Sequence, residues 1–186
     1  MKKTLRTEIK KRIAKLSPDE KKLLSESILL KIEQLPEFKT AKNILLFHSL
    51  PDEVVTHTFF KKWKNQKCLI LPVVNGDELD LKYYKGNEQL KTGSFGVQEP
   101  QGELFTEWGK IDLILIPGIA FDRNQNRLGR GKGYYDKLLP KISGIKIGIC
   151  FPCQLVDAVP CQEWDVKMDK IITAENELFC PRNKST

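Results

Sequence analysis

The sequence predicts a single α/β domain, a three-layer α/β/α sandwich around a mostly parallel, Rossmann-like sheet with some antiparallel edge. Near-continuous apolar runs at residues 111–117 (IDLILIP) and 145–151 (IKIGICF) are typical of strands buried on both faces, as in parallel sheets. Segments with helical periodicity or capping residues alternate with such runs. A length of 186 residues suits one domain, residues 1–186, with a sizeable core.

Two helices are expected before the first strand. Residues 3–15 carry apolar side chains at three- and four-residue steps, which predicts one apolar face made of Leu5, Ile9, Ile13 and Leu16. Residues 17–34 begin with SPDE, in which a Ser cap, a Pro in the first turn and a later Glu mark a helix start, and Pro36 ends that helix. We expect residues 1–35 to form a helical pair that packs on the sheet of an α/β core at residues 43–174.

The rest of the chain alternates strands and short helices. Further strands are expected at residues 43–50, 68–74, 79–84 and 170–173. Short helices, the first capped by Thr56, are expected at residues 56–66, 134–139 and 154–159. Residues 85–110 are loop-rich, and a loop of that length in a compact domain is often functional. The polar tail, residues 175–186, is expected to fray.

The chain is basic, and its charge is unevenly placed. The net charge is +7, and residues 1–42 hold twelve Lys and Arg against six Asp and Glu, a balance of +6. A basic end indicates an anionic partner, which a nucleic acid, a nucleotide or a polyanionic small molecule would satisfy. The sequence has no RNA- or DNA-recognition motif, and its aromatic residues stand at apolar-face spacings, so we expect no nucleic-acid partner.

Composition and cysteine use indicate a reducing, aqueous compartment. No apolar run approaches the roughly 20 residues of a membrane span, and the charged stretch after Met1 is unlike a signal peptide. Five cysteines without an export signal indicate reduced thiols. Cys150 and Cys153 have redox-motif spacing, but no thioredoxin-like pattern surrounds them. We therefore expect a cytoplasmic monomer with no membrane partner and no catalytic cysteine.

The stretch from residue 111 to residue 139 carries the chemistry. Its apolar strand leads into a loop dense in Gly, Asn and Arg, residues 118–133, and then into a helix start. That arrangement presents backbone amides to a phosphate. The loop alternates glycines, which allow close backbone approach, with cations that bind phosphate oxygens, in the run Gly129, Arg130, Gly131, Lys132 and Gly133. Asp136 follows, a hard oxygen ligand of the kind that holds Mg²⁺ beside a nucleotide.

This loop matches neither of two common nucleotide motifs. It is not a Walker A motif, because Lys132 is followed by Gly133 rather than by Ser or Thr. It is not a dinucleotide fingerprint, because Tyr134 stands where the third Gly belongs. A solvated basic turn that leads into a helix would carry the same residues, so both interpretations stay open on the loop alone.

A longer pattern surrounds the loop. The twenty residues PGIAFDRNQNRLGRGKGYYD, 117–136, closely resemble the signature of the 5-formyltetrahydrofolate cyclo-ligase family, also called methenyltetrahydrofolate synthetase, and looser similarity runs nearly end to end. The resemblance implies an ATP-dependent ligase that converts 5-formyltetrahydrofolate, with or without a polyglutamate tail, to 5,10-methenyltetrahydrofolate, ADP and phosphate. It implies phosphorylation of the formyl oxygen and intramolecular ring closure, with Mg²⁺ as cofactor and ATP as co-substrate.

The resemblance also implies a set of site residues. Catalytic roles fall to Arg130, Lys132 and Tyr134. The ATP-binding residues would be Lys2, Lys3, Thr4, Leu5, Arg6, Arg127, Leu128, Gly129, Arg130, Gly131, Lys132, Gly133, Tyr134 and Tyr135. The substrate-binding residues would be His48, Glu53, Arg130, Gly131, Lys132, Gly133 and Tyr134. The metal ligands, direct or through water, would be Asp136 and Asp165.

Position supports two of these assignments. Glu53 follows the first expected strand at its carboxyl end, where ligands bind in open α/β sheets, and His48 lies near the same strand end. The resemblance makes Glu53 the carboxylate that hydrogen-bonds the pterin ring; without it, a loop Glu is normally solvated. Residues 95–100 (FGVQEP) resemble a family segment on the folate side of the cleft. Trp164 departs from the His or Asn that family members commonly carry there.

Two alternative functions stay open. A basic nucleic-acid-binding module would keep its affinity for RNA at physiological salt. A sugar-phosphate isomerase or transferase could use a similar fold, since fold does not fix function. A requirement for ATP hydrolysis would separate the ligase from the second alternative.

Overall fold

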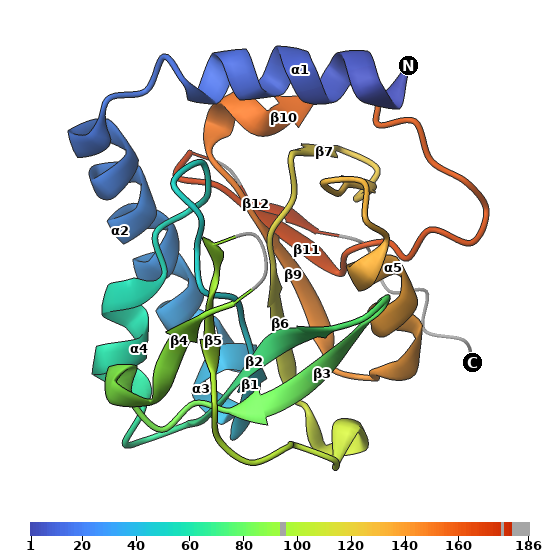
Figure 1. The fold of residues 1–186 in the computed structure, drawn as a ribbon. Coiled ribbons are helices and arrows are strands. Elements are labelled where there is room, and N and C mark those ends of the chain that lie inside the picture. The colour runs from blue at the N-terminus through green and yellow to red at the C-terminus, as the bar shows by residue number, and fades with distance from the viewer. Residues whose placement is uncertain (94–95, 176, 180–186) are drawn as a thin grey trace.

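A seven-stranded sheet forms the middle layer of the molecule (Figure 1). The computed structural model describes residues 1–93, 96–175 and 177–179. In order across the sheet the strands are β12 (Glu177–Phe179), β11 (Lys170–Ile172), β9 (Ile145–Ile149), β6 (Leu113–Ile116), β1 (Asn43–Leu45), β2 (Cys68–Asn75) and β3 (Glu78–Tyr83). Every pairing from β11 to β2 is parallel, and the edge strands β3 and β12 pair antiparallel. The predicted mostly parallel sheet with an antiparallel edge is confirmed.

Helices cover both faces of this sheet (Figure 1). In β6, Leu113 and Leu115 point into one apolar core, and Ile114 and Ile116 point into the other, all four fully buried. The first core also contains side chains of α1 (Lys2–Ile13), α2 (Pro18–Gln34), α3 (Pro36–Thr40) and α4 (His57–Trp63). The second contains side chains of α5 (Tyr134–Leu138) and the 3-10 turn η4 (Leu139–Lys141). A strand with a core on each side must be apolar throughout, which explains its sequence.

The capping residues of α2 act as the sequence predicts. The backbone N–H of Glu20 donates to Ser17 Oγ (3.2 Å), and the backbone N–H of Ser17 donates to Glu20 Oε2 (2.7 Å). The pair of bonds is a capping box, which satisfies backbone donors that have no partner inside the helix. Pro36 ends α2 as predicted, and it also begins α3.

The first strand is shorter than predicted. It ends at Leu45 rather than at residue 50. Beyond it, the Thr56 hydroxyl donates to the carbonyl of Phe47 (2.7 Å) and accepts from the backbone N–H of Ser49 (3.2 Å). Thr56 stands at the N-cap of α4, but its hydroxyl makes these bonds instead of capping that helix. The Thr56 hydroxyl therefore bonds backbone groups of Phe47 and Ser49, which lie within the predicted strand but beyond the end of β1.

Residues 154–159 do not form the predicted helix. They continue from the 3-10 turn η5 (Pro152–Gln154) into the short strand β10 (Leu155–Val156). The Gln154 side chain donates to the carbonyls of Gly118 (2.8 Å) and Ile119 (3.1 Å), which draws this segment alongside the loop after β6. These long-range bonds override the local helical preference.

The loop expected at residues 118–133 holds its own small sheet. In this sheet β7 (Ala120–Asp122) pairs parallel with β10 and antiparallel with β8 (Arg127–Leu128). The loop-rich stretch 85–110 likewise contains β4 (Leu90–Thr92), β5 (Gln98–Pro100) and the turns η1 (Asn87–Gln89) and η3 (Trp108–Lys110). Part of the tail that was expected to fray, residues 177–179, forms β12, and residues 176 and 180–186 lie outside the described residues.

Within the described residues, no helix combines the length and the apolar character that a membrane crossing requires.

Leu115→Ala should lower the free energy of unfolding by about 2–5 kcal/mol, because a fully buried side chain of the central strand is replaced by a cavity. Equilibrium urea unfolding measures this loss. Leu30→Ala makes the same chemical change at a position of α2 that is 54% exposed, and it should cost less than about 0.5 kcal/mol. Equal losses in the two variants would contradict the central position of β6.

Candidate active site

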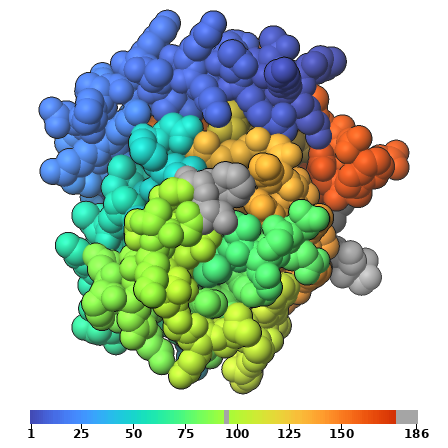
Figure 2. All heavy atoms as spheres, in the orientation of Figure 1, coloured from blue at the N-terminus to red at the C-terminus, as the bar shows by residue number. Residues whose placement is uncertain are grey.

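A cavity of about 450 Å³ opens at the carboxyl edge of the sheet, where α/β folds place ligands, and its volume suits a small molecule. Figure 2 shows the face of the molecule on which the elements around the cavity lie. They are α1 in blue, the β2–β3 hairpin in green and the loop near residue 130 in orange. Its lining residues are Lys10, Phe47, His48, Leu50, Glu53, Pro72, Val74, Leu79, Val97, Glu99, Pro117, Gly118, Arg127, Gly129, Arg130, Gly131, Lys132, Gly133, Tyr134, Tyr135 and Asp136.

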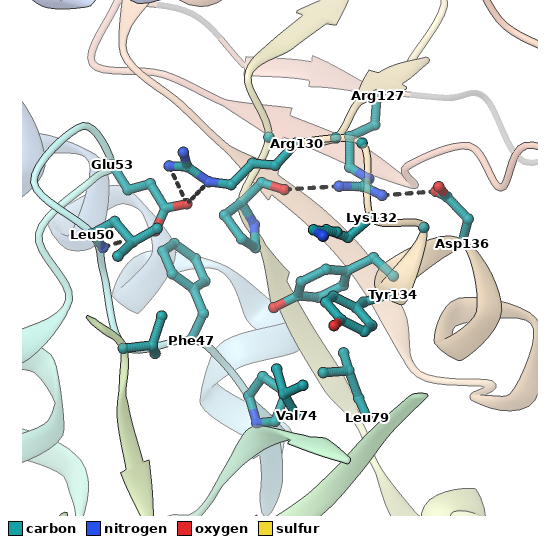
Figure 3. Close-up of a pocket in the computed structure, with 18 of the residues that line it drawn as sticks. Phe47, Leu50, Glu53, Val74, Leu79, Arg127, Arg130, Lys132, Tyr134 and Asp136 are labelled. Atoms are coloured by element: carbon teal, nitrogen blue, oxygen red, sulfur yellow. Dashed lines mark hydrogen bonds and ion pairs between the residues drawn. The ribbon is translucent and has the colours of Figure 1, made fainter. Parts of the chain in front are cut away.

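The cavity has an apolar side and a charged side. Figure 3 shows Phe47, Val74 and Leu79 on one side, with Glu53 and the charged loop residues on the other. An apolar wall favours the flat body of a ligand, and the charged residues favour its polar and anionic groups. The site is therefore suited to a ligand that has a flat apolar body and also polar or anionic groups.

A buried carboxylate fixes the loop that supplies the charged side. Asp122 is only 1% exposed. Its Oδ1 accepts from the backbone N–H groups of Asn124 (2.9 Å) and Asn126 (3.0 Å). Its Oδ2 accepts from Asn126 Nδ2 (2.9 Å) and from the backbone N–H of Val159 (2.8 Å). These bonds satisfy the carboxylate inside the fold and anchor the turn between β7 and β8.

Arg127 is fixed by the protein itself. Its Nη1 donates to the carbonyl of Pro117 (3.2 Å), and its Nη2 donates to Asp136 Oδ1 (2.8 Å). The guanidinium lies 5.3 Å from the ring centre of Tyr135, and the side chain is 6% exposed. Arg127 therefore ties the end of β6 to the start of α5, and it also lines the cavity.

The glycines of the loop take conformations that side chains would strain. Gly131 has φ +106° and Gly133 has φ +73°, both in the region that favours glycine. Gly133 precedes α5, which has only five residues. Because such a short helix has a small macrodipole, the loop amides and cationic side chains must provide most of the attraction for an anion.

Arg130 is held by two neighbouring carboxylates. Its Nε and Nη2 donate to Glu53 Oε1 (3.0 and 2.8 Å), and its Nη1 and Nη2 donate to the two oxygens of Asp52 (3.1 and 2.5 Å). Glu53 Oε2 also accepts from the backbone N–H of Leu50 (2.9 Å). The structure thus joins the predicted folate-binding carboxylate directly to a predicted catalytic arginine.

The pKa values of the two carboxylates are shifted in opposite directions, although burial raises both. Burial raises the pKa of Glu53, and Arg130 offsets only part of that effect. Burial acts the same way on Asp52, but its hydrogen bonds and ion pair with Arg130 outweigh burial, so its pKa lies below the usual value. Glu53 therefore depends on its partners to stay ionised more than Asp52 does.

The two histidines of the chain lie together beside the cavity. The ring centres of His48 and His57 are 4.1 Å apart, and Ser49 Oγ is 3.1 Å from His57 Nε2. Burial, with a smaller contribution from the charge of His57, lowers the pKa of His48 to about 4. Burial also lowers the pKa of His57. Near neutral pH both rings are therefore uncharged, and His48 presents a neutral imidazole to the cavity.

Two side chains near the start of α1 contact distant parts of the chain. Arg6 Nε donates to the carbonyl of Gly129 (2.8 Å), which joins α1 to the glycine-rich loop. Lys2 Nζ lies 3.5 Å from Asp165 Oδ2. Lys3 and Thr4 are exposed, and Leu5 packs against the first core.

The two predicted metal ligands occupy different surroundings. Asp136 lines the cavity and pairs with Arg127, whereas Asp165 pairs with Lys2 and accepts from the backbone N–H of Gln162 (2.9 Å). The described residues contain no group of three or more His, Cys, Asp or Glu side chains that could hold a metal ion. Any metal here would take most of its ligands from a bound anion and water.

The remaining residues that the sequence singled out lie in different parts of the molecule. Tyr134 lines the cavity, and its hydroxyl donates to the carbonyl of Gly76 (3.4 Å). Leu128 is buried in the first core, so any contact of residue 128 with a ligand would come from its backbone. In the segment expected on the folate side, Val97 and Glu99 line the cavity, and Phe95 lies outside the described residues. Trp164 is 72% exposed.

Sequence reasoning missed three charged residues of the site. Lys10 reaches the cavity from α1, Asp52 holds Arg130, and Glu99 is a buried carboxylate on the cavity wall. The adjacency of Asp52 to Glu53 was a usable signal for the second of these. Nothing in the local sequence distinguishes Lys10 from the other basic residues of α1.

Fold and site together define a class: an α/β enzyme in which a cationic glycine-rich loop and buried carboxylates face one small-molecule cavity. The family model described as the 5-formyltetrahydrofolate cyclo-ligase family matches residues 1–174. The chain belongs to this family, which confirms the resemblance carried by residues 117–136.

Relatives and solved structures agree with that assignment. The chain is 32% identical to the 5-formyltetrahydrofolate cyclo-ligase of Mus musculus over 92% of each chain. It is 31% identical to the enzyme of the same name from Haemophilus influenzae over 90% of this chain and 95% of that one. It resembles the NMR structure of Aquifex aeolicus 5,10-methenyltetrahydrofolate synthetase with a TM-score of 0.89 and 35% identity, covering 100% of this chain and 95% of that one. It also resembles the structure of a 5,10-methenyltetrahydrofolate synthetase from Mycoplasma pneumoniae, with a TM-score of 0.76 and 31% identity, covering 93% of this chain and 98% of that one.

The two neighbouring histidines give a pH prediction. The folded pKa of His48, about 4, lies below its ordinary value of about 6.5, so folding favours the neutral ring. The stability that this provides should be complete above about pH 6.5 and lost as the pH falls toward 4. NMR titration of the ring protons reports the midpoint directly, and the chain has only two histidines to assign.

His57→Gln serves as the assignment variant for that titration. It should raise the His48 pKa modestly, because it removes the smaller of the two causes of the shift and leaves burial in place. A wild-type midpoint near 6.5 for His48 would contradict its placement.

Proposed function

We propose that this protein converts 5-formyltetrahydrofolate to 5,10-methenyltetrahydrofolate with cleavage of ATP to ADP and phosphate. One observation carries the proposal: the cationic glycine-rich loop and the buried carboxylate Glu53 face the same apolar-walled cavity and are joined through Arg130. A folate and a nucleotide bound there would meet at the loop. Family membership supports the choice of this reaction over a sugar-phosphate isomerase or transferase.

The chemistry explains the need for ATP. The oxygen of a formamide is a poor leaving group. Transfer of the γ-phosphoryl group to that oxygen gives an imidate phosphate and ADP. Nitrogen 10 of the same folate then attacks the activated formyl carbon and the ring closes. Nitrogen 10 loses its proton, and the phosphate departs with the former formyl oxygen, so that the proton is balanced in hydrogen phosphate. Because both nitrogens belong to one molecule, ring closure gains effective molarity if the pocket bends the folate correctly.

The protein's part in this scheme is mainly positioning and charge neutralisation. We assign stabilisation of the transferring phosphoryl group to Arg130 and Lys132, with the backbone amides of residues 129–133. Tyr134 would contact the ligands where folate and ATP meet. Arg127 would act from a fixed position, because the protein already holds its guanidinium at both ends.

The residues present fit a magnesium ion that is bound together with ATP. Asp136 lines the cavity with a half-exposed side chain, and the bond from Arg127 occupies one of its oxygens. Mg²⁺ commonly takes one or two protein carboxylates and completes its shell with phosphates and water, so a larger acidic cluster is not required. Asp136 would hold it directly and Asp165 through water. The ion would supply positive charge that neutralises the phosphates.

Glu53 and Arg130 would exchange partners when folate binds. The two bonds from Arg130 use the acceptor capacity of Glu53 Oε1, and Leu50 uses part of that of Oε2. To accept the paired N–H donors of a pterin edge, Glu53 must give up at least one bond to Arg130. The freed guanidinium donors would then turn to the phosphoryl group. The polyglutamate tail of a substrate could approach the basic side chain of Lys10 at the cavity.

The decisive experiment follows the absorbance of methenyl-folate in purified protein supplied with 5-formyltetrahydrofolate. Product should form only when both ATP and Mg²⁺ are present, and removal of Mg²⁺ by EDTA should stop it. ADP should appear in equal amount. Product formation without ATP, or ATP cleavage without product, would refute the proposal.

Glu53→Gln should weaken folate binding by about ten- to hundredfold, since an amide donor replaces an acceptor at a buried position, a cost of about 1–3 kcal/mol. ATP affinity should change far less. Asp52→Asn is the matched control, because it removes the other carboxylate from the same guanidinium and leaves the pterin acceptor intact. Separate titrations with 5-formyltetrahydrofolate and ATP measure both effects. Equal losses for the two ligands would refute the role of Glu53.

A further inference from the structure

A second buried carboxylate faces the cavity. Glu99 belongs to β5, is only 7% exposed and lines the cavity together with the apolar residues Pro72 and Val74. Its Oε1 accepts a hydrogen bond from the backbone N–H of Val74 (3.2 Å). Glu99 has no role in the reaction scheme proposed above.

Among the residues that the structure describes, only one oxygen of Glu99 accepts a hydrogen bond. Among the described residues, no hydrogen bond to Oε2 and no ion pair to this carboxylate is formed, whereas Glu53 has Arg130 and Leu50. Burial of a carboxylate costs free energy unless donors surround it. A buried carboxylate with an unused acceptor on the wall of a cavity is therefore suited to a donor that arrives with the ligand.

The backbone beside Glu99 has room for the carboxylate only because residue 93 is glycine. A Cβ added to Gly93 would overlap the Glu99 carboxylate and lie 2.8 Å from its Cγ. Gly93 does not have a positive φ, so its conformation alone does not require glycine. Glycine at residue 93 thus leaves the space that the Glu99 carboxylate occupies.

We propose that Glu99 is a second substrate-recognising carboxylate, which accepts an N–H of the pterin ring from the apolar side of the cavity. The inference rests on the proposed function, which supplies a ligand with several N–H donors on one flat ring. A bond from such a donor to a desolvated carboxylate is charge-assisted and stronger than a neutral one. Glu53 and Glu99 would then accept hydrogen bonds from different N–H groups of the same ring.

The test compares direct binding of two ligands to Glu99→Gln. Its affinity for 5-formyltetrahydrofolate should fall at least about tenfold, because a neutral amide replaces the carboxylate acceptor. Its affinity for ATP and its thermal midpoint should stay near the wild-type values. Glu103→Gln removes the same charge from an exposed position outside the cavity and should leave both affinities unchanged.

Gly93→Ala provides an independent variant that keeps the carboxylate but displaces it. It should show the same selective loss of folate affinity. Unchanged folate binding in Glu99→Gln, or an equal loss for folate and ATP in both variants, would overturn the inference and leave the proposed function intact. Failure of the wild-type protein to bind 5-formyltetrahydrofolate or to form methenyl-folate would instead overturn the proposed function.

Discussion

The buried carboxylate of Asp122 is the interaction on which the loop and the cavity depend. A carboxylate removed from water must find its donors within the protein, and Asp122 finds four, two of them backbone groups of one short turn and one the backbone of Val159. The turn therefore has one conformation that satisfies the charge. Since that turn leads into Arg127 and the glycines, it helps to hold the cationic groups of the loop in place before any ligand arrives.

The fold could be predicted where local sequence and burial agree. The apolar runs of β6 and β9 are explained by a core on each face of the sheet, and the capping box of α2 is a local interaction. Predictions were wrong where a side chain bonds across the chain. Gln154 binds carbonyls 35 and 36 residues away and replaces the expected helix, and Thr56 bonds Phe47 instead of capping α4. Such bonds depend on tertiary positions that periodicity does not encode.

The residues of the candidate site also differ in how far the sequence could predict them. Most residues of the glycine-rich signature loop line the cavity, as does Glu53 near the end of the first strand, and their binding and catalytic roles stay predictions. Arg127 and Arg130 were both predicted to bind ATP, and only Arg130 was predicted to be catalytic. In the structure Arg127 is held by Pro117 and Asp136, whereas Arg130 is shared between Asp52 and Glu53. The resemblance placed residues 95–100 beside the cleft but did not single out Glu99, and nothing indicated Lys10, whose position at the cavity follows from how α1 packs on distant parts of the chain.

The attachment of α1 has a consequence for how the protein is made. Its bond from Arg6 to Gly129 spans 123 residues, and its ion pair from Lys2 to Asp165 spans 163. Contacts of such separation form only after a large loop has closed, and hence late. As the chain is made, α1 therefore precedes its docking surface and can dock only after residues 129 and 165 have followed. The part of the cavity wall that α1 supplies is thus completed well after α1 itself has been made.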